Sequence, residues 1–290
     1  MAAAPLHSEV TVQQRSLVAA DGTKLFLLDW LIPPDQSARG GIVLMHGLGE
    51  HCGRYGHVAE FFNQQGWSVR AYDHRGHGRS GGPRGDVPNE HALLDDAELV
   101  IADFSRENSA QWSGAPLLFG HSMGGLFAAR FAGAARLPLR GLILSSPVLT
   151  LKLTAFQSML ARVMRRIAPG FAVSNGLKAE FLSHDLALVE AYRVDPYGQG
   201  KISARLLQSM IASIEIAQRS AGALRIPVLM LVAGDDRLVD AAGSDAFFAR
   251  LDPANAVMQR YQGMYHEIFN EIDKQRVFAD VAAWLALPGR

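Results

Sequence analysis

Residues 116–125 read Pro-Leu-Leu-Phe-Gly-His-Ser-Met-Gly-Gly. The apolar first half predicts a buried strand, and a helix is expected to begin near Met123. Between them, Gly120, Ser122 and Gly124 form the pattern G-x-S-x-G, in which a tight turn places the serine in a strained backbone conformation. Such a turn forms where the residues two positions away have no side chain, and both are glycine here. The stretch therefore predicts that Ser122 projects from a strand-to-helix turn as a nucleophile.

On both sides of this turn the chain alternates short apolar runs with amphipathic segments. The apolar runs predict strands at residues 42–45, 68–72, 116–119, 141–144, 228–232 and 256–261. Helices are expected at residues 55–65, 93–104 and 277–285, and a pair of short strands between residues 9 and 31. Because strands and helices alternate, we expect a mostly parallel central sheet with helices on both faces.

The alternation is interrupted in the middle of the chain. No clear strand run occurs from Leu151 to Gly222, where apolar residues instead fall at helical spacing within residues 156–167 and 206–214. The predicted organisation is a core of residues 1–147 and 223–290 and a helical cap of residues 148–222 inserted in it. A helical cap insertion over the carboxyl edge of such a sheet, together with the serine turn, predicts an α/β-hydrolase fold.

The composition excludes several classes of protein. The 290 residues include 28 basic and 28 acidic side chains and no polybasic stretch, so no nucleic-acid partner is expected. Cys52 is the only cysteine, which excludes an intramolecular disulfide and a metal site built on cysteines. Residues 1–10 lack the pattern of a signal peptide, and no run of about 18 apolar residues predicts a membrane-spanning helix. We therefore expect a cytoplasmic protein.

A serine nucleophile needs a base and an acid that orients it, and this fold supplies them in the chain order Ser, Asp, His. The acid is expected just after the strand at residues 228–232, where Asp235, Asp236 and Asp240 compete. Position alone leaves Asp235 and Asp236 equally good candidates. The base is expected after the last strand, where His266 follows Tyr265.

The third requirement is an oxyanion hole, a pair of N–H groups that stabilise the negative oxygen of the intermediate. One donor is expected to be the backbone N–H of Met123, directly after the nucleophile. The other is expected from the loop of residues 45–51, which follows an early strand and contains two glycines. Its candidate donor is the N–H of Leu48.

Five motifs together closely resemble the monoacylglycerol lipases. They are His46-Gly47-Leu48-Gly49-Glu50-His51 followed by Arg54-Tyr55, then Asp73-His74-Arg75-Gly76-His77-Gly78-Arg79-Ser80, Gly120-His121-Ser122-Met123-Gly124-Gly125, Asp236-Arg237-Leu238 and Tyr265-His266-Glu267. The resemblance extends over most of the chain. It implies a hydrolase that cleaves carboxylic esters of single-chain lipids, above all monoacylglycerols, without a metal or another cofactor.

The resemblance also implies roles for individual residues. The acid of the family directly precedes an Arg-Leu pair, which favours Asp236 over Asp235. The positions of Leu48 and Met123 supply the oxyanion N–H groups in the family. Glu50 and Arg54 match positions at the polar end of the pocket, where a glycerol headgroup could be held. Some members have a polar side chain shortly after the histidine, whereas this chain has Ile268 and Phe269 after Glu267.

The histidines of the loop at residues 73–80, and His121, invite a catalytic interpretation that we do not favour. The loop of residues 73–80 is expected to support the oxyanion segment, because its glycines indicate tight turns. His121 is expected to be a packing residue that points away from Ser122.

The expected partner is a small-molecule lipid ester. The predicted cap helix carries Arg162, Arg165 and Arg166, and such a helix could also touch an anionic membrane, although packing on the core is the favoured interpretation. Alternative functions are a lysophospholipase, a carboxylesterase or a thioesterase of broad specificity. A non-catalytic binding protein on this fold is less favoured, because such proteins usually lack a member of the triad.

Overall fold

The computed structural model describes residues 12–152, 154, 159, 163, 164 and 166–290. Residues 1–10 and most of the helix predicted at residues 156–167, with Arg162 and Arg165, lie outside the described residues. No helix in the described part of the chain is both long enough and apolar enough to cross a membrane.

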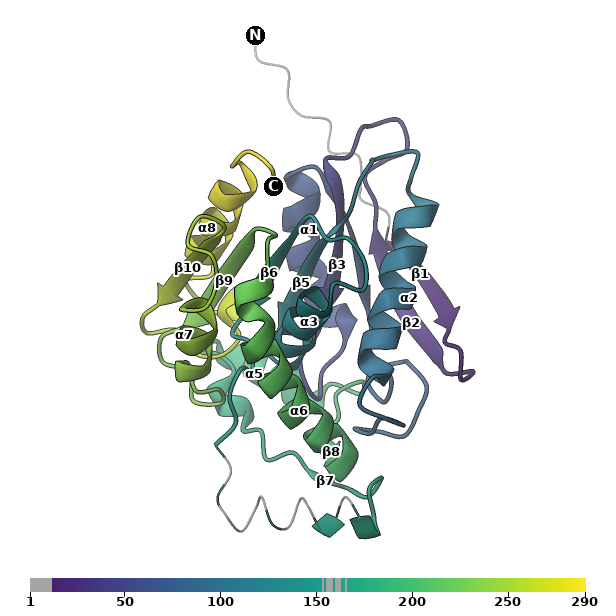
Figure 1. Cartoon of the computed structure of the whole chain (residues 1–290), viewed down its shortest axis with the longest axis vertical. Coiled ribbons are helices and arrows are strands. Elements are labelled where there is room, and N and C mark those ends of the chain that lie inside the picture. The colour runs from purple at the N-terminus through teal and green to yellow at the C-terminus, as the bar shows by residue number, and fades with distance from the viewer. Residues whose placement is uncertain (1–11, 153, 155–158, 160–162, 165) are drawn as a thin grey trace.

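A sheet of eight strands forms the centre of the molecule (Figure 1). In spatial order its strands are β1 (Val12–Val18), β2 (Lys24–Trp30), β4 (Trp67–Tyr72), β3 (Gly40–Met45), β5 (Leu117–His121), β6 (Gly141–Ser145), β9 (Val228–Ala233) and β10 (Ala256–Tyr261). β1 and β2 are antiparallel to each other, and β2 is antiparallel to β4, whereas all pairs from β4 to β10 are parallel. The predicted mostly parallel sheet is therefore confirmed.

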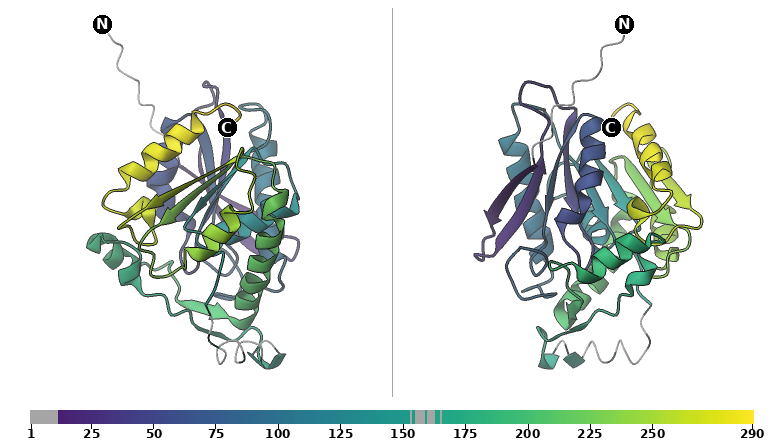
Figure 2. Two further views of the ribbon diagram at one scale, coloured as in Figure 1. Left: turned by 60° about the vertical axis from the view of Figure 1, so that its left-hand side comes forward. Right: turned by 180° about the vertical axis from the view of Figure 1, so that it is seen from behind.

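Helices cover both faces of this sheet because the strand side chains alternate between two apolar cores. Val43 and Met45 of β3 belong to the core shared with α2 (Ala92–Glu107), α3 (Met123–Ala134), α6 (Ala204–Ser220) and α7 (Ala242–Phe248). Ile42 and Leu44 belong to the opposite core, shared with α1 (Gly56–Gln64) and α8 (Gln275–Leu285). Figure 2 shows α1 and α8 in front when the molecule is seen from behind. The two-sided cover predicted from the sequence is confirmed.

The segment between β6 and β9 contains β7 (Ala172–Ser174), α5 (Leu186–Val194), β8 (Lys201–Ser203) and α6. β7 and β8 pair antiparallel as a small second sheet. The expectation that this segment contains no strand is therefore wrong, since strands of three residues are too short to produce a visible alternation. α6 packs on α3 through the apolar core, with Leu206 and Met210 buried. The cap boundaries at residues 148 and 222 remain a prediction.

Candidate active site

The turn around Ser122 has the strained geometry that the sequence predicts. Ser122 has φ 54° and ψ −116°, a backbone conformation that residues other than glycine rarely adopt. Its N–H donates to the Ser145 carbonyl at 2.9 Å, which ties the turn to β6. A Cβ on Gly120 would collide with the Gly124 backbone, and a Cβ on Gly124 would collide with the Met45 carbonyl. Both glycines are therefore required for α3 to begin directly behind the serine.

A continuous chain of hydrogen bonds joins the three predicted triad residues. The Ser122 hydroxyl lies 2.9 Å from His266 Nε2, and His266 Nδ1 lies 2.7 Å from Asp236 Oδ2. Asp236 Oδ1 accepts the backbone N–H groups of Leu238 and Val239, both at 2.9 Å. These bonds place the ring proton on Nδ1 and leave Nε2 free to accept from the serine.

Asp235, the other candidate acid, has a different environment. Its backbone N–H donates to the Met264 carbonyl, and the residue is exposed. The structure thus brings Asp236 next to His266 and leaves Asp235 facing solvent.

Asp236 and His266 shift each other's pKa. Burial alone would raise the pKa of Asp236, but the charge and hydrogen bond of His266 and the two N–H donors lower it overall. Burial alone would lower the pKa of His266, but the charge and hydrogen bond of Asp236, with a contribution from Glu267, raise it overall. Asp236 is therefore placed to stabilise the protonated imidazole.

A cavity of about 610 Å³ opens over the serine. Leu48, Ser122, Met123 and His266 lie in its wall. Apolar side chains from the segment between β6 and β9 form much of the remainder, among them Leu177, Phe181, Leu182, Leu207 and Met210. Within the described part of the chain, the N–H groups of Leu48 and Met123 donate to no other protein atom. Both predicted oxyanion donors therefore border the cavity without a partner.

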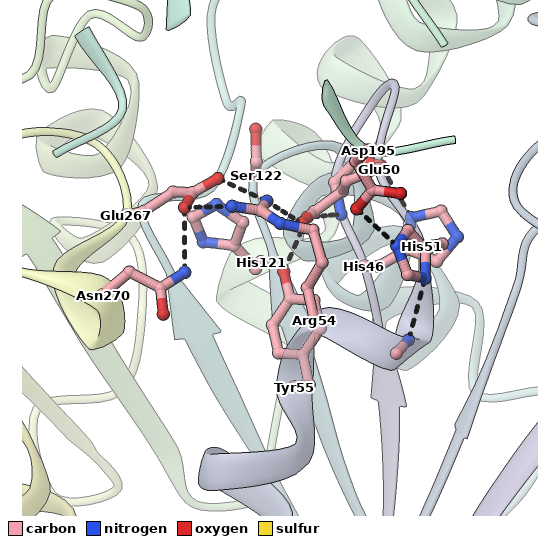
Figure 3. Close-up of polar contacts among 12 residues, drawn as sticks. His46, Glu50, His51, Arg54, Tyr55, His121, Ser122, Asp195, Glu267 and Asn270 are labelled. Carbon is pink, nitrogen blue, oxygen red and sulfur yellow. Dashed lines mark hydrogen bonds and ion pairs between the residues drawn. The ribbon is translucent and has the colours of Figure 1, made fainter. Parts of the chain in front are cut away.

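A cluster of buried charges lies beside Ser122 (Figure 3). Arg54 donates to Glu50 Oε2 at 2.6 Å and binds both carboxylate oxygens of Glu267, at 2.6 and 2.7 Å. The guanidinium also lies 5.0 Å from the ring centre of Tyr192. Glu50, Glu267 and Tyr192 line the cavity. The sequence pointed to Glu50 and Arg54 but missed Glu267 as their partner, because nothing in the sequence pairs residues 54 and 267.

His121 is buried, as expected of a packing residue, and it lies beside the histidine of the triad. Its ring lies 4.8 Å from the His266 ring, lines the same cavity and places Nδ1 3.0 Å from Ser145 Oγ. Burial and then the charge of His266 lower the pKa of His121 to about 4, so the ring is neutral near neutral pH.

The loop of residues 73–80 lies behind the oxyanion segment, and none of its residues borders the cavity. Asp73 accepts the N–H groups of Cys52 and Arg79, each at 2.7 Å, and so fastens this loop to the segment after the oxyanion residues. Among the described residues, no group of three or more His, Cys, Asp or Glu side chains is arranged to hold a metal ion.

Fold and site together define a serine hydrolase of the α/β type. Residues 36–273 match the family model described as "Serine aminopeptidase, S33". The chain is 34% identical to a monoacylglycerol lipase of Mycolicibacterium smegmatis, covering 95% of this chain and 97% of that protein. It is 32% identical to the phospholipase YtpA of Bacillus subtilis, covering 84% and 93%. The crystal structure of the Paleococcus ferrophilus monoacylglycerol lipase aligns with a TM-score of 0.78 at 33% identity, covering 95% and 98%.

The chain belongs to the monoacylglycerol lipase family, within the hydrolases that this family model describes. The resemblance, the α/β-hydrolase fold and the class of carboxylic ester hydrolase predicted from the sequence are thereby confirmed.

We expect kcat/KM for ester hydrolysis to fall at low pH, with a midpoint above the ordinary histidine pKa of about 6.5. The reason is that His266 must be neutral to accept a proton, and its raised pKa keeps it protonated to a higher pH. In Asp236→Asn the cause of the raised pKa is removed, so the midpoint should move to lower pH while the plateau falls about 10⁴-fold. The measurement is kcat/KM for p-nitrophenyl butyrate from about pH 5 to about pH 9.

The matched control is Asp235→Asn, which should leave both the midpoint and the plateau unchanged because Asp235 faces solvent. A midpoint that responds to Asp235→Asn and not to Asp236→Asn would reverse the assignment.

Proposed function

We propose that this protein hydrolyses monoacylglycerol to glycerol and a fatty acid through an acyl-enzyme on Ser122. The observation that carries the proposal is the hydrogen-bond chain from Ser122 through His266 to Asp236 at the base of an apolar cavity. A volume of about 610 Å³ lies in the range of small-molecule pockets. The similarity to two monoacylglycerol lipases, at 34% and 33% identity, supports this substrate.

The mechanism is acyl transfer in two steps. His266 Nε2 takes the hydroxyl proton of Ser122 as Oγ attacks the ester carbonyl, and Asp236 stabilises the imidazolium that results. The N–H groups of Leu48 and Met123 bind the oxyanion. His266 then gives its proton to the leaving glycerol oxygen. Water repeats the sequence on the acyl-enzyme and releases the fatty acid.

Ser122→Ala should lower kcat for 1-monoacylglycerol about 10⁶-fold, since no other group can form the acyl-enzyme. Ser174→Ala is the matched control, because Ser174 borders the same cavity and is exposed. It should retain the wild-type rate. The measurement is fatty acid release, with covalent labelling by a fluorophosphonate as a second readout. Undiminished hydrolysis by pure Ser122→Ala would overturn the assignment.

A second candidate substrate is a single-chain lipid with an anionic headgroup. Lys178 and Arg237 border the cavity, are exposed, and both lie against the Phe181 ring, at 5.5 and 5.4 Å from its centre. Among the described residues, neither cation has a carboxylate partner. Two such cations suit the phosphate of a lysophospholipid. The similarity to a phospholipase of Bacillus subtilis supports this candidate.

Lys178→Gln should lower kcat/KM for lysophosphatidylglycerol about fivefold, the value of one exposed ion pair of about 1 kcal/mol. Monoacylglycerol with the same acyl chain should be hydrolysed at an unchanged rate. Lys201→Gln is the control, because Lys201 is an exposed lysine of the same segment that does not border the cavity. Equal rates for both substrates in Lys178→Gln would exclude the anionic headgroup site.

We further propose that the segment between β6 and β9 touches a lipid surface, because apolar side chains are exposed there. Ile167 is 77% exposed, and Phe171 and Val173 follow it. Ile167→Ser should reduce co-sedimentation of the protein with anionic vesicles. Ile272→Ser is the control, since Ile272 is 69% exposed and lies after the triad histidine. Equal binding by wild type and Ile167→Ser would contradict this contact.

A further inference from the structure

The backbone on both sides of Gly47 is held by side chains. Its N–H donates to Glu50 Oε1 at 2.5 Å, and its carbonyl lies 2.7 Å from His46 Nδ1. His46 Nε2 accepts the backbone N–H of His74 at 2.9 Å, so the ring proton must be on Nδ1, from which it is donated to the Gly47 carbonyl. Two consecutive peptide planes are thus fixed, one by a carboxylate and one by an imidazole.

This arrangement determines the direction of the next N–H group. The Gly47 carbonyl and the Leu48 N–H belong to the same trans peptide, in which the two bonds point in opposite directions. Because His46 holds the carbonyl toward the protein interior, the Leu48 N–H points to the other side. Leu48 and Ser122 border the cavity there.

The Glu50 carboxylate lies so close to Gly47 that a side chain at position 47 would displace it. A Cβ on Gly47 would lie 2.7 Å from Glu50 Oε1 and 3.2 Å from the Cβ of Ser122. The carboxylate and the nucleophile therefore both lie near the Cα of Gly47, and a shift of the carboxylate, which binds the Gly47 N–H, would move the backbone relative to the serine.

Three donors within the protein bind the carboxylate of Glu50. Besides the Gly47 N–H, Oε1 accepts the Tyr55 hydroxyl at 2.6 Å, and Oε2 accepts from Arg54 at 2.6 Å. Glu50 is only 4% exposed. A group bound in this way is suited to hold its neighbours in place more than to bind a headgroup.

We propose that Glu50 is a positioning residue: it holds the peptide before Gly47, as His46 holds the peptide after it, and the two together aim the Leu48 N–H at the oxyanion. This inference rests on the proposed acyl transfer at Ser122, and it differs from the role in headgroup binding that the resemblance implied for Glu50. Arg54 and Tyr55 keep the carboxylate in place, and the bidentate pair of Arg54 with Glu267 connects it to the segment of His266.

Two conservative variants separate the effect of side-chain length from the effect of charge. Glu50→Gln keeps an oxygen at the distance of the Gly47 N–H but removes the negative charge. Glu50→Asp keeps the charge beside Arg54 but is one methylene too short to reach the N–H. Positioning predicts that Gln is the better replacement. We expect kcat to fall about tenfold in Glu50→Gln and about 100-fold in Glu50→Asp, the latter near the loss of one oxyanion donor.

Two substrates with the same acyl group separate positioning from headgroup binding. For p-nitrophenyl butyrate and 1-monobutyrin, positioning predicts an equal loss in kcat and a KM that changes less than about twofold. Headgroup binding predicts a higher KM for monobutyrin and an unchanged rate for the p-nitrophenyl ester, and that result would overturn the proposal. So would a Glu50→Asp variant more active than Glu50→Gln.

The rate at which a fluorophosphonate labels Ser122 is a second readout, and it needs no turnover of a lipid. The phosphoryl oxygen of the probe occupies the same N–H donors as the oxyanion, so the rate depends on their position. Labelling should be slower in Glu50→Gln than in wild type, and slowest in Glu50→Asp. Wild type that labels but does not cleave monoacylglycerol would refute the proposed substrate and still test Glu50. Thermal unfolding reports on the fold of each variant. Glu60→Gln is the control, because Glu60 is exposed on α1, and it should keep wild-type kcat.

Discussion

The packing of α3 against the end of β3 is the constraint on which the site depends. Gly124 lies so close to the Met45 carbonyl that no side chain fits between the helix and the strand. This contact, with the bond of the Ser122 N–H to β6, holds the serine at φ 54° although that conformation is unfavourable by itself. Because α3 begins directly after the serine, the Met123 N–H at its start is left without a partner at the cavity.

The order of the strands then brings the remaining groups to this point. β3 lies next to β5, so the loop with Leu48 and the turn with Ser122 leave the sheet side by side. β9 and β10 are parallel neighbours, so Asp236 and His266, which follow them, leave the same edge together. Parallel strands are the reason that four segments far apart in the sequence can form one site.

The same reasoning explains what the sequence could and could not predict. The alternation of apolar runs and the glycines around Ser122 are local patterns, and they predicted the sheet, its helices and the turn. Residues 54 and 267 are paired only by the folded sheet, so no local pattern could indicate the ion pair of Arg54 with Glu267. The orientation of His121 depends on the packing of its ring against His266, and the strands β7 and β8 are too short for a period to appear. Local order could be predicted, and the resemblance named the triad residues that hydrogen bonds join across the sheet, whereas contacts with neither a local pattern nor a known motif could not.

The charges beside the triad have opposite effects on the two ions that form in the reaction, the imidazolium and the oxyanion. Glu50 and Glu267 share one arginine, so the cluster is net negative, and both carboxylates contribute to the raised pKa of His266. That charge favours the imidazolium but would repel an oxyanion formed at the same time. The three donors on Glu50 reduce this repulsion, because they neutralise part of its charge on the side facing Gly47. In the proposed mechanism the carboxylate therefore lies beside the loop of Leu48 and organises it without cancelling the stabilisation expected from the Leu48 and Met123 N–H groups.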